Sequence, residues 1–228
     1  MIRVACLNEP GYVYIMFTLP NILTMIRLIA APMVAVMFLY FTRPYADWAA
    51  LILFVGAALT DWLDGFLARA WKQESKLGAM LDPIADKSMV VIALLVLAGV
   101  FDLDALILLP AILIVFREVF VSGLREFLGD LSEALKVTKM AKWKTTAQMI
   151  SIALLFAVGI FEHYFTTETG GRDLQNGSEA SGLPHFSFYY NGMYASWYSG
   201  VLLLWAAAAL TVVTGIDYFR KALPYLRD

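Results

Sequence analysis

Four aspartates in two closely spaced pairs are the residues of this sequence with the clearest capacity for chemistry. Asp61 and Asp64 are three positions apart, and Asp82 and Asp86 are four positions apart. On an α-helix, either spacing places both side chains on one face. Because only a short basic segment separates the two pairs, we expect their helices to be antiparallel neighbours and all four carboxylates to converge.

Converging carboxylates need a compensating positive charge, because ionised carboxylates at close range repel one another. Two divalent cations would supply it. Ligation by oxygen alone suits Mg²⁺ or Mn²⁺, and these segments contain no His or Cys that would favour zinc. A lone Asp at a helix end is more often a cap or a solvated side chain. Four at this spacing, with the small residues Gly65, Ala68 and Gly78 between them, favour a two-metal site that a ligand can approach closely.

The composition places this chemistry in a membrane. Of the 228 residues, 61% are hydrophobic and only 16% are charged, and the mean hydropathy is +0.70. A soluble domain carries roughly 45–50% apolar and about 25% charged residues, so this chain has too much apolar surface for one core of ordinary size. The composition disfavours a soluble enzyme, a disordered chain and a nucleic-acid binder. We expect an all-α polytopic membrane protein.

Six stretches are apolar enough to be transmembrane helices, since a span needs about 20 mostly apolar residues. They lie near residues 20–42, 47–70, 80–101, 104–125, 143–164 and 194–219. The first five run directly into charged residues in a helical pattern. Because backbone in lipid must stay hydrogen-bonded, we expect these helices to continue and their polar ends to share a cavity on one side of the membrane.

The chain is expected to form a single domain over residues 1–228. Residues 1–19 are expected to form a short interfacial helix and residues 165–193 a polar outer loop. Fifteen of the 17 Lys and Arg residues fall on the side that holds both termini. Cytoplasmic segments carry the excess of basic residues, so both termini and the cavity are expected in the cytoplasm. Aromatic residues that follow the outer loop are expected at the opposite interface: Tyr189, Tyr190, Tyr194, Trp197 and Tyr198.

The carboxylate segment resembles the signature of the CDP-alcohol phosphotransferases at every fixed position. It reads Asp61-x2-Asp64-Gly65-x2-Ala68-Arg69-x8-Gly78-x3-Asp82-x3-Asp86, eight specified residues in 26. The resemblance implies an integral protein of a bacterial plasma membrane, with six transmembrane helices, a homodimer and a two-metal site open to the cytoplasm. It also implies that the four matching aspartates hold Mg²⁺ or Mn²⁺ and that Asp86 is the general base.

The same resemblance implies a site for the CDP part of the donor CDP-diacylglycerol. The residues that match this site are Asn21, Thr24, Arg27, Gly65, Arg69, Ser75 and Gly78. Arg69 would present a planar donor to phosphate oxygens. Two simpler explanations stay open for these residues. Gly65 could serve only to let two helices pack closely, and Arg69 could be one of the basic residues that are common on the cytoplasmic side.

Basic residues in the fourth and fifth spans predict a pocket for a second, phosphorylated substrate. Arg117 and Arg125 lie in the fourth span, and Lys142 and Lys144 begin the fifth. The excess of cytoplasmic basic residues alone could account for cations here. That explanation is weakest for Arg117, which interrupts an apolar helix.

Residues 18–150 resemble the branch of the family that makes phosphatidylglycerophosphate. This resemblance implies transfer of the phosphatidyl group from CDP-diacylglycerol to sn-glycerol 3-phosphate, with release of CMP. A sibling enzyme that uses inositol phosphate would need the cations equally, whereas one that uses serine or phosphatidylglycerol would need fewer. A divalent-cation transporter is the alternative from another class, but it predicts acidic residues through the whole membrane depth, and here they cluster at one end.

Overall fold

The computed structural model of the chain describes residues 19–71, 76–129, 140–170 and 185–226, and within these ranges it is all-helical. The side chains of residues 20, 62–71, 76, 79 and 140–142 lie outside this description. The helices are α1 (Leu19–Tyr40), α2 (Tyr45–Trp71), α3 (Lys76–Val100), α4 (Ala105–Leu128), α6 (Met140–Thr169) and α8 (Phe186–Ala222), followed by the short 3₁₀ helix η1 (Leu223–Tyr225). The predicted interfacial helix at residues 1–19 falls almost wholly outside the described residues.

In the part of the chain that the structure describes, five helices are long and apolar enough to cross a membrane: α1, α3, α4, α6 and α8. The prediction of an all-α integral membrane protein is therefore confirmed. The helix α2 is not among the five, although its 27 residues would reach about 40 Å at 1.5 Å per residue. Five of the six predicted spans thus agree with the structure in length and composition, and the crossing by α2 stays a prediction.

The outer connection is shorter than the predicted loop at residues 165–193. The helix α6 continues to Thr169, and α8 already begins at Phe186. Threonines at the end of α6 donate their hydroxyls to carbonyls of the same helix, as Thr167 does to His163 at 2.8 Å. The rings of Phe165 and Phe186 then pack across the two helices, with centroids 5.4 Å apart. Polar composition suggested a loop here, but the helix satisfies its own polar groups.

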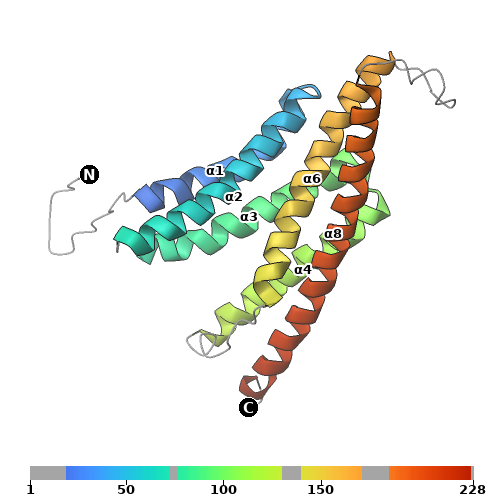
Figure 1. Ribbon diagram of the computed structural model, residues 1–228. Coiled ribbons are helices and arrows are strands. Elements are labelled where there is room, and N and C mark those ends of the chain that lie inside the picture. The colour runs from blue at the N-terminus through green and yellow to red at the C-terminus, as the bar shows by residue number, and fades with distance from the viewer. Residues whose placement is uncertain (1–18, 72–75, 130–139, 171–184, 227–228) are drawn as a thin grey trace.

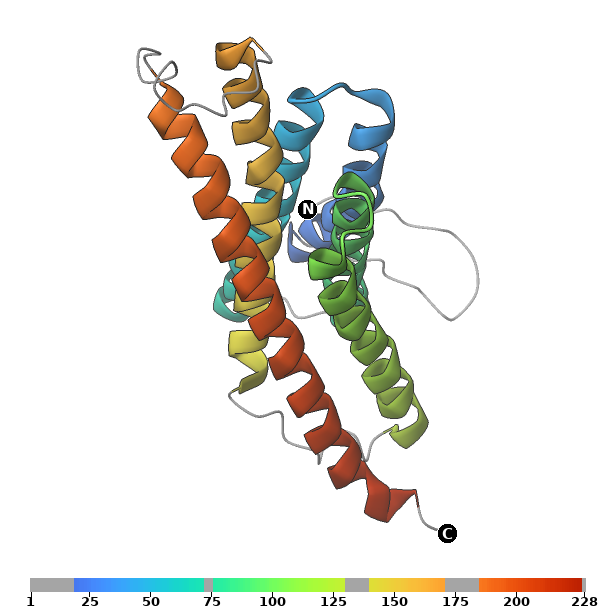
Figure 2. The ribbon, with the colours of Figure 1, turned by 90° about the vertical axis from the view of Figure 1, so that its right-hand side faces the viewer.

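The helices form two groups that share one core (Figures 1 and 2). In one group α1 packs against both α2 and α3, and in the other α8 packs against α6 and α4. The side chain of Phe156 on α6 joins the groups, since its ring lies 6.0 Å from that of Phe38 on α1 and 6.2 Å from that of Phe54 on α2. Phe156 is buried with Leu94, so the two groups share one apolar centre.

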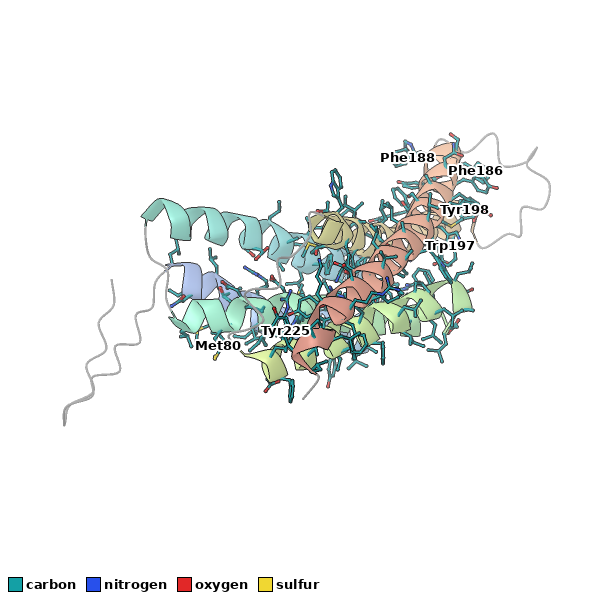
Figure 3. The ribbon with its side chains drawn as sticks, turned by 90° about the horizontal axis from the view of Figure 1, so that it is seen from below. Met80, Phe186, Phe188, Trp197, Tyr198 and Tyr225 are labelled. Carbon is teal, nitrogen blue, oxygen red and sulfur yellow. The ribbon has the colours of Figure 1, made fainter. Side chains whose placement is uncertain are left out.

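Large apolar side chains also cover the outside of the bundle (Figure 3). Aromatic residues Phe186, Phe188, Trp197 and Tyr198 lie toward one end of α8, whereas Tyr225 lies beyond its other end. Phe188 and Tyr198 are each about two-thirds exposed. An apolar outer surface of this extent is what a bundle in contact with lipid requires.

Candidate active site

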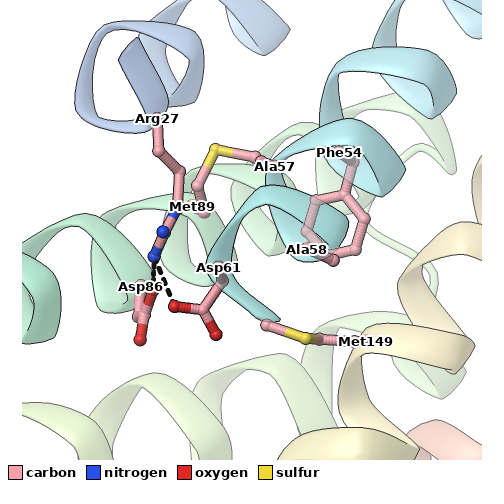
Figure 4. Close-up of a pocket in the computed structure, with 8 residues that line it drawn as sticks. All are labelled: Arg27, Phe54, Ala57, Ala58, Asp61, Asp86, Met89 and Met149. Carbon is pink, nitrogen blue, oxygen red and sulfur yellow. Dashed lines mark hydrogen bonds and ion pairs between the residues drawn. The ribbon is translucent and has the colours of Figure 1, made fainter. Parts of the chain in front are cut away.

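Arg27 of α1 contacts one aspartate on each of the two helices α2 and α3 (Figure 4). Its side chain is 2% exposed, and one nitrogen, Nη1, lies 2.6 Å from Oδ1 of Asp61 and 2.5 Å from Oδ1 of Asp86. A buried guanidinium without a counter-ion would be strongly destabilising, so the two carboxylates stabilise its position. This contact brings α1, α2 and α3 together at one point.

Thr24 makes a parallel contact one turn earlier on α1. Its hydroxyl donates to Oδ1 of Asp82 at 2.6 Å. Thr24 and Arg27 are three positions apart and both buried, so one face of α1 contacts the carboxylates of α2 and α3. Asn21, a further three positions back, is also buried, as is Gly78 in the first turn of α3.

Asp61 and Asp86 lie at the edge of an apolar pocket and are themselves partly exposed. Asp61 and Asp86 have side chains that are 39% and 40% exposed. The pocket that they line with Arg27 is otherwise apolar, and Phe54, Met89 and Met149 contribute to it (Figure 4). A ligand can therefore reach these carboxylates from one side, while the apolar side chains keep water out of the other.

The aspartates are suitable ligands for a hard divalent cation, because carboxylate oxygens are the ligands that Mg²⁺ and Mn²⁺ prefer. Among the side chains that the structure describes, no three His, Cys, Asp or Glu residues gather closely enough to hold a metal ion. Asp64, the fourth predicted ligand, lies on α2 where side chains are outside the description. Arg27 supplies the positive charge between Asp61 and Asp86 in this structure.

Three further predicted donor-site residues lie near the α2–α3 connection. Gly65 and Arg69 belong to the last turns of α2, and nothing is described beyond their backbone. Ser75 lies outside the described residues. Their predicted contact with the CDP group stays a prediction.

A second polar cluster joins α3, α4 and α6, and its centre is Glu118. This carboxylate accepts a hydrogen bond from Nζ of Lys144, and its Oε1 lies 3.2 Å from Nη1 of Arg117. Lys144 is 4% exposed as a residue, so its charge needs this partner. On the neighbouring turn of α4, Ser122 donates to the carbonyl of Glu118 at 2.5 Å and accepts from Lys87 of α3.

Two of the four cations predicted for the acceptor site, Arg117 and Lys144, therefore form ion pairs with the same carboxylate. That carboxylate belongs to Glu118, which was not among the residues predicted from the sequence. An acidic residue beside Arg117 in an otherwise apolar stretch was the signal that could have found it. Arg125 lies instead over the ring of Tyr218 on α8, with 5.2 Å from its guanidinium carbon to the ring centre. The side chain of Lys142 is not described.

Gly215 of α8 lets the stem of Arg117 lie close to that helix. A Cβ atom added at Gly215 would be 3.0 Å from Cγ of Arg117. That distance is tighter than most real contacts of a Cβ atom, so a larger residue would push the Arg117 side chain away from α8. The helix α8 thus helps to set the direction of Arg117.

Comparison with known proteins decides the family. A sequence profile described as CDP-alcohol phosphatidyltransferase matches residues 17–213, which is most of the chain. The chain belongs to this family. The family membership that was predicted from the aspartate signature is therefore confirmed.

Three curated relatives carry the same name. A protein of Cereibacter sphaeroides is 58% identical over 219 residues, covering 93% of this chain and 98% of that protein. One of Rickettsia bellii is 34% identical over 207 residues, covering 91% and 96%. One of Escherichia coli K12 is 39% identical over 151 residues, covering 65% and 82%. Each of the three is named CDP-diacylglycerol–glycerol-3-phosphate 3-phosphatidyltransferase.

Proposed function

We propose that this CDP-alcohol phosphatidyltransferase transfers the phosphatidyl group of CDP-diacylglycerol to sn-glycerol 3-phosphate, giving phosphatidylglycerophosphate and CMP. The relatives' shared name supports this reaction. The observation that carries it in the structure is the adjacency of two clusters on α3. Asp86 faces Arg27, and the next residue, Lys87, contacts Ser122 in the Glu118 cluster. A carboxylate that can accept a proton thus adjoins cations that can bind a phosphate.

The four aspartates Asp61, Asp64, Asp82 and Asp86 are the proposed ligands of two divalent ions, Mg²⁺ or Mn²⁺. Bound there, the ions would neutralise the pyrophosphate of the donor and the charge that develops on the leaving oxygen. The partial exposure of Asp61 and Asp86 supports this assignment, because ions and donor must enter from solvent.

The CDP group of the donor is proposed to lie against Asn21, Thr24, Arg27, Gly65, Arg69, Ser75 and Gly78. The position of Thr24 and Arg27 on the face of α1 that contacts Asp82 and Asp86 supports this assignment, because it places them next to the proposed metal ligands. Arg69 would bind phosphate oxygens in two parallel hydrogen bonds, which a lysine cannot do.

Asp86 is the proposed general base. It would accept the proton of the acceptor's hydroxyl as that oxygen forms a bond with the lipid-bearing phosphorus. The bond between this phosphorus and the CMP oxygen breaks, and CMP leaves with the electron pair. The hydrogen bond from Arg27 fixes the orientation of the Asp86 carboxylate for this transfer.

The phosphate of the acceptor is proposed to bind to Arg117, Arg125, Lys142 and Lys144. The contact of Arg117 and Lys144 with one carboxylate supports a site for a second anion at the same cations. Glu118 would hold Arg117 and Lys144 in fixed positions before the substrate arrives. Inositol phosphate is the alternative acceptor that these cations fit equally, whereas serine and phosphatidylglycerol make less use of them.

The proposed setting is a bacterial plasma membrane, with both termini and the active site in the cytoplasm and two copies forming a homodimer. The one-sided distribution of Lys and Arg supports the orientation. The family resemblance supports the dimer.

A panel of acceptors tests the proposed reaction. Purified protein with CDP-diacylglycerol and Mg²⁺ should release CMP rapidly with sn-glycerol 3-phosphate, and far more slowly with inositol phosphate, serine, phosphatidylglycerol or glycerol. Faster release with another acceptor would reassign the substrate. No release with any acceptor, together with Mn²⁺ flux into vesicles that contain the protein, would favour the transporter.

A further inference from the structure

A cavity of about 460 Å³ lies at the end of the bundle opposite the aspartates. Its polar lining comes from Arg43 in the α1–α2 turn, Asp102 in the α3–α4 turn and Glu162 on α6. Tyr194 and Trp197 line it from α8. Four parts of the chain therefore converge on this space, and none of the residues that line it belongs to the proposed active site.

The distance between the two sites follows from α2. Asp47 contacts Arg43 in the first turn of α2, and Asp61 lies 14 residues later on the same helix. At 1.5 Å per residue, this separation is about 20 Å, a large part of a bilayer core. Val100, which also lines the cavity, lies 14 residues after Asp86 on α3, a helix that is long and apolar enough to cross a membrane, so we expect the cavity to face the leaflet opposite the aspartates.

Arg43 is held firmly at the edge of this cavity. Its Nη2 lies 3.2 Å from Oδ1 of Asp47, and its Nη1 lies 3.3 Å from Oε2 of Glu162. Asp47 is 1% exposed, and its other oxygen, Oδ2, has no hydrogen-bond partner among the described residues. Gly159 leaves room for this carboxylate, since a Cβ atom added there would overlap Oδ1 of Asp47.

The charge around the cavity favours a cationic ligand. Its described lining holds two carboxylates, Asp102 and Glu162, and the single guanidinium of Arg43. That guanidinium already faces Asp47 and Glu162. An anion would meet carboxylates, whereas an ammonium group could accept their charge and hydrogen bonds.

The aromatic lining favours the same kind of ligand. The rings of Phe101 and Trp197, which both line the cavity, lie 5.0 Å apart at 54°. Tyr190, Tyr194 and Tyr198 form an aromatic ladder along α8. The ring centre of Tyr194 lies 4.6 Å from that of Tyr190 and 6.1 Å from that of Tyr198. Aromatic faces attract ammonium groups, and Tyr and Trp on a membrane helix lie at the depth of the lipid headgroups.

We infer that this cavity binds the ammonium headgroup of a zwitterionic phospholipid from the leaflet opposite the active site. Glu162 and Asp102 face the ammonium group, and Tyr194 and Trp197 form its aromatic wall. The exposed edge of Arg43, whose side chain is 37% exposed, lies beside the lipid phosphate.

Lipid retention by the full-length protein tests this inference. The protein is reconstituted with phosphatidylethanolamine, phosphatidylcholine and phosphatidylglycerol of identical acyl chains, extracted in mild detergent and examined by native mass spectrometry. We expect one zwitterionic lipid per chain to be retained in preference to phosphatidylglycerol. Glu162→Gln and Tyr194→Leu should each reduce that preference about tenfold, as expected for loss of one charged or cation–π contact in a desolvated site.

Tyr198→Leu is the matched control, because Tyr198 belongs to the same aromatic ladder but does not line the cavity. Each variant should still release CMP at the wild-type rate, which also reports that it is folded. Selection of phosphatidylethanolamine alone supports a hydrogen-bonded primary ammonium, and equal selection of phosphatidylcholine supports a cation–π site. Equal retention of all three lipids by the wild type, or equal losses in Tyr194→Leu and Tyr198→Leu, would overturn the inference.

Discussion

Arg27 and Asp86 lie 59 positions apart in the sequence, yet Nη1 of the arginine is 2.5 Å from Oδ1 of the aspartate. The arginine is buried and the aspartate is partly exposed, so the cation approaches the carboxylate from the protein side. Solvent reaches the same carboxylate from the other side. This arrangement orients the proposed base while leaving it accessible to a substrate.

Removal of Arg27 should make the protein depend on divalent ions for stability. In Arg27→Met, Asp61 and Asp86 lose their shared cation, and we expect a loss of about 2 kcal/mol in the absence of metal. Added Mg²⁺ should raise the melting temperature of this variant more than that of the wild type. Arg220→Met on the exposed end of α8 is the control. An equal response of both variants to Mg²⁺ would argue against a metal site at these carboxylates.

Replacement of the proposed base should abolish turnover and leave donor binding largely intact. Asp86→Asn keeps the size of the side chain but cannot accept the proton, so CMP release should fall by roughly 10³-fold. Binding of CDP-diacylglycerol, measured by calorimetry in detergent, should change little. Asp217→Asn, an exposed aspartate paired only with Lys221 among the described residues, serves as the control. Asp86→Asn with near-normal turnover would exclude Asp86 as the base.

Arg117→Ala should weaken the binding of the acceptor substrate but not that of CDP-diacylglycerol. Loss of one guanidinium–phosphate contact should raise the KM for sn-glycerol 3-phosphate roughly 10- to 100-fold. The KM for CDP-diacylglycerol should stay within about twofold, because no residue of the proposed donor site lies on α4. Steady-state kinetics with each substrate varied in turn measure the two effects. Similar increases for both substrates would contradict an acceptor pocket at Arg117.

Glu118→Gln should make the stability of the protein depend on the acceptor. Without this carboxylate, the buried Lys144 and the partly buried Arg117 lose their shared counter-ion, so the melting temperature should fall. Glycerol 3-phosphate should restore it, because its phosphate replaces the missing charge. Glu126→Gln, an exposed site on the same helix, should show neither effect. If glycerol 3-phosphate stabilises the variant no more than the wild type, the acceptor phosphate binds elsewhere.

Much of the fold could be predicted from the sequence because hydropathy alone marks membrane helices. The predicted spans lie within the observed helices to within a few residues, as at residues 104–125 against Ala105–Leu128. The end of α6 could not be predicted in this way. Its threonines bond to their own helix, so polar composition and helical structure coexist there.

Only those features of the site that depend on the spacing of residues within one helix could be predicted from the sequence. The separations of Asp61 from Asp64 and of Asp82 from Asp86 indicate shared helix faces, and the structure brings Asp61 and Asp86 to one arginine. Glu118 contacts Lys144, which is 26 positions away on another helix. No periodicity within either helix indicates that pair, because α4 and α6 are brought together by their packing against α8.

The most direct measurement of the central claim follows a label from acceptor to lipid. Purified wild-type protein is incubated with CDP-diacylglycerol, Mg²⁺ and sn-glycerol 3-phosphate carrying ¹³C in its three carbons, and the lipids are analysed by mass spectrometry. The proposed reaction predicts a lipid that carries all three labelled carbons and both phosphates, formed in equal amount with CMP, and none of it with Asp86→Asn. CMP release without a labelled lipid, or a labelled lipid that lacks the second phosphate, would contradict it.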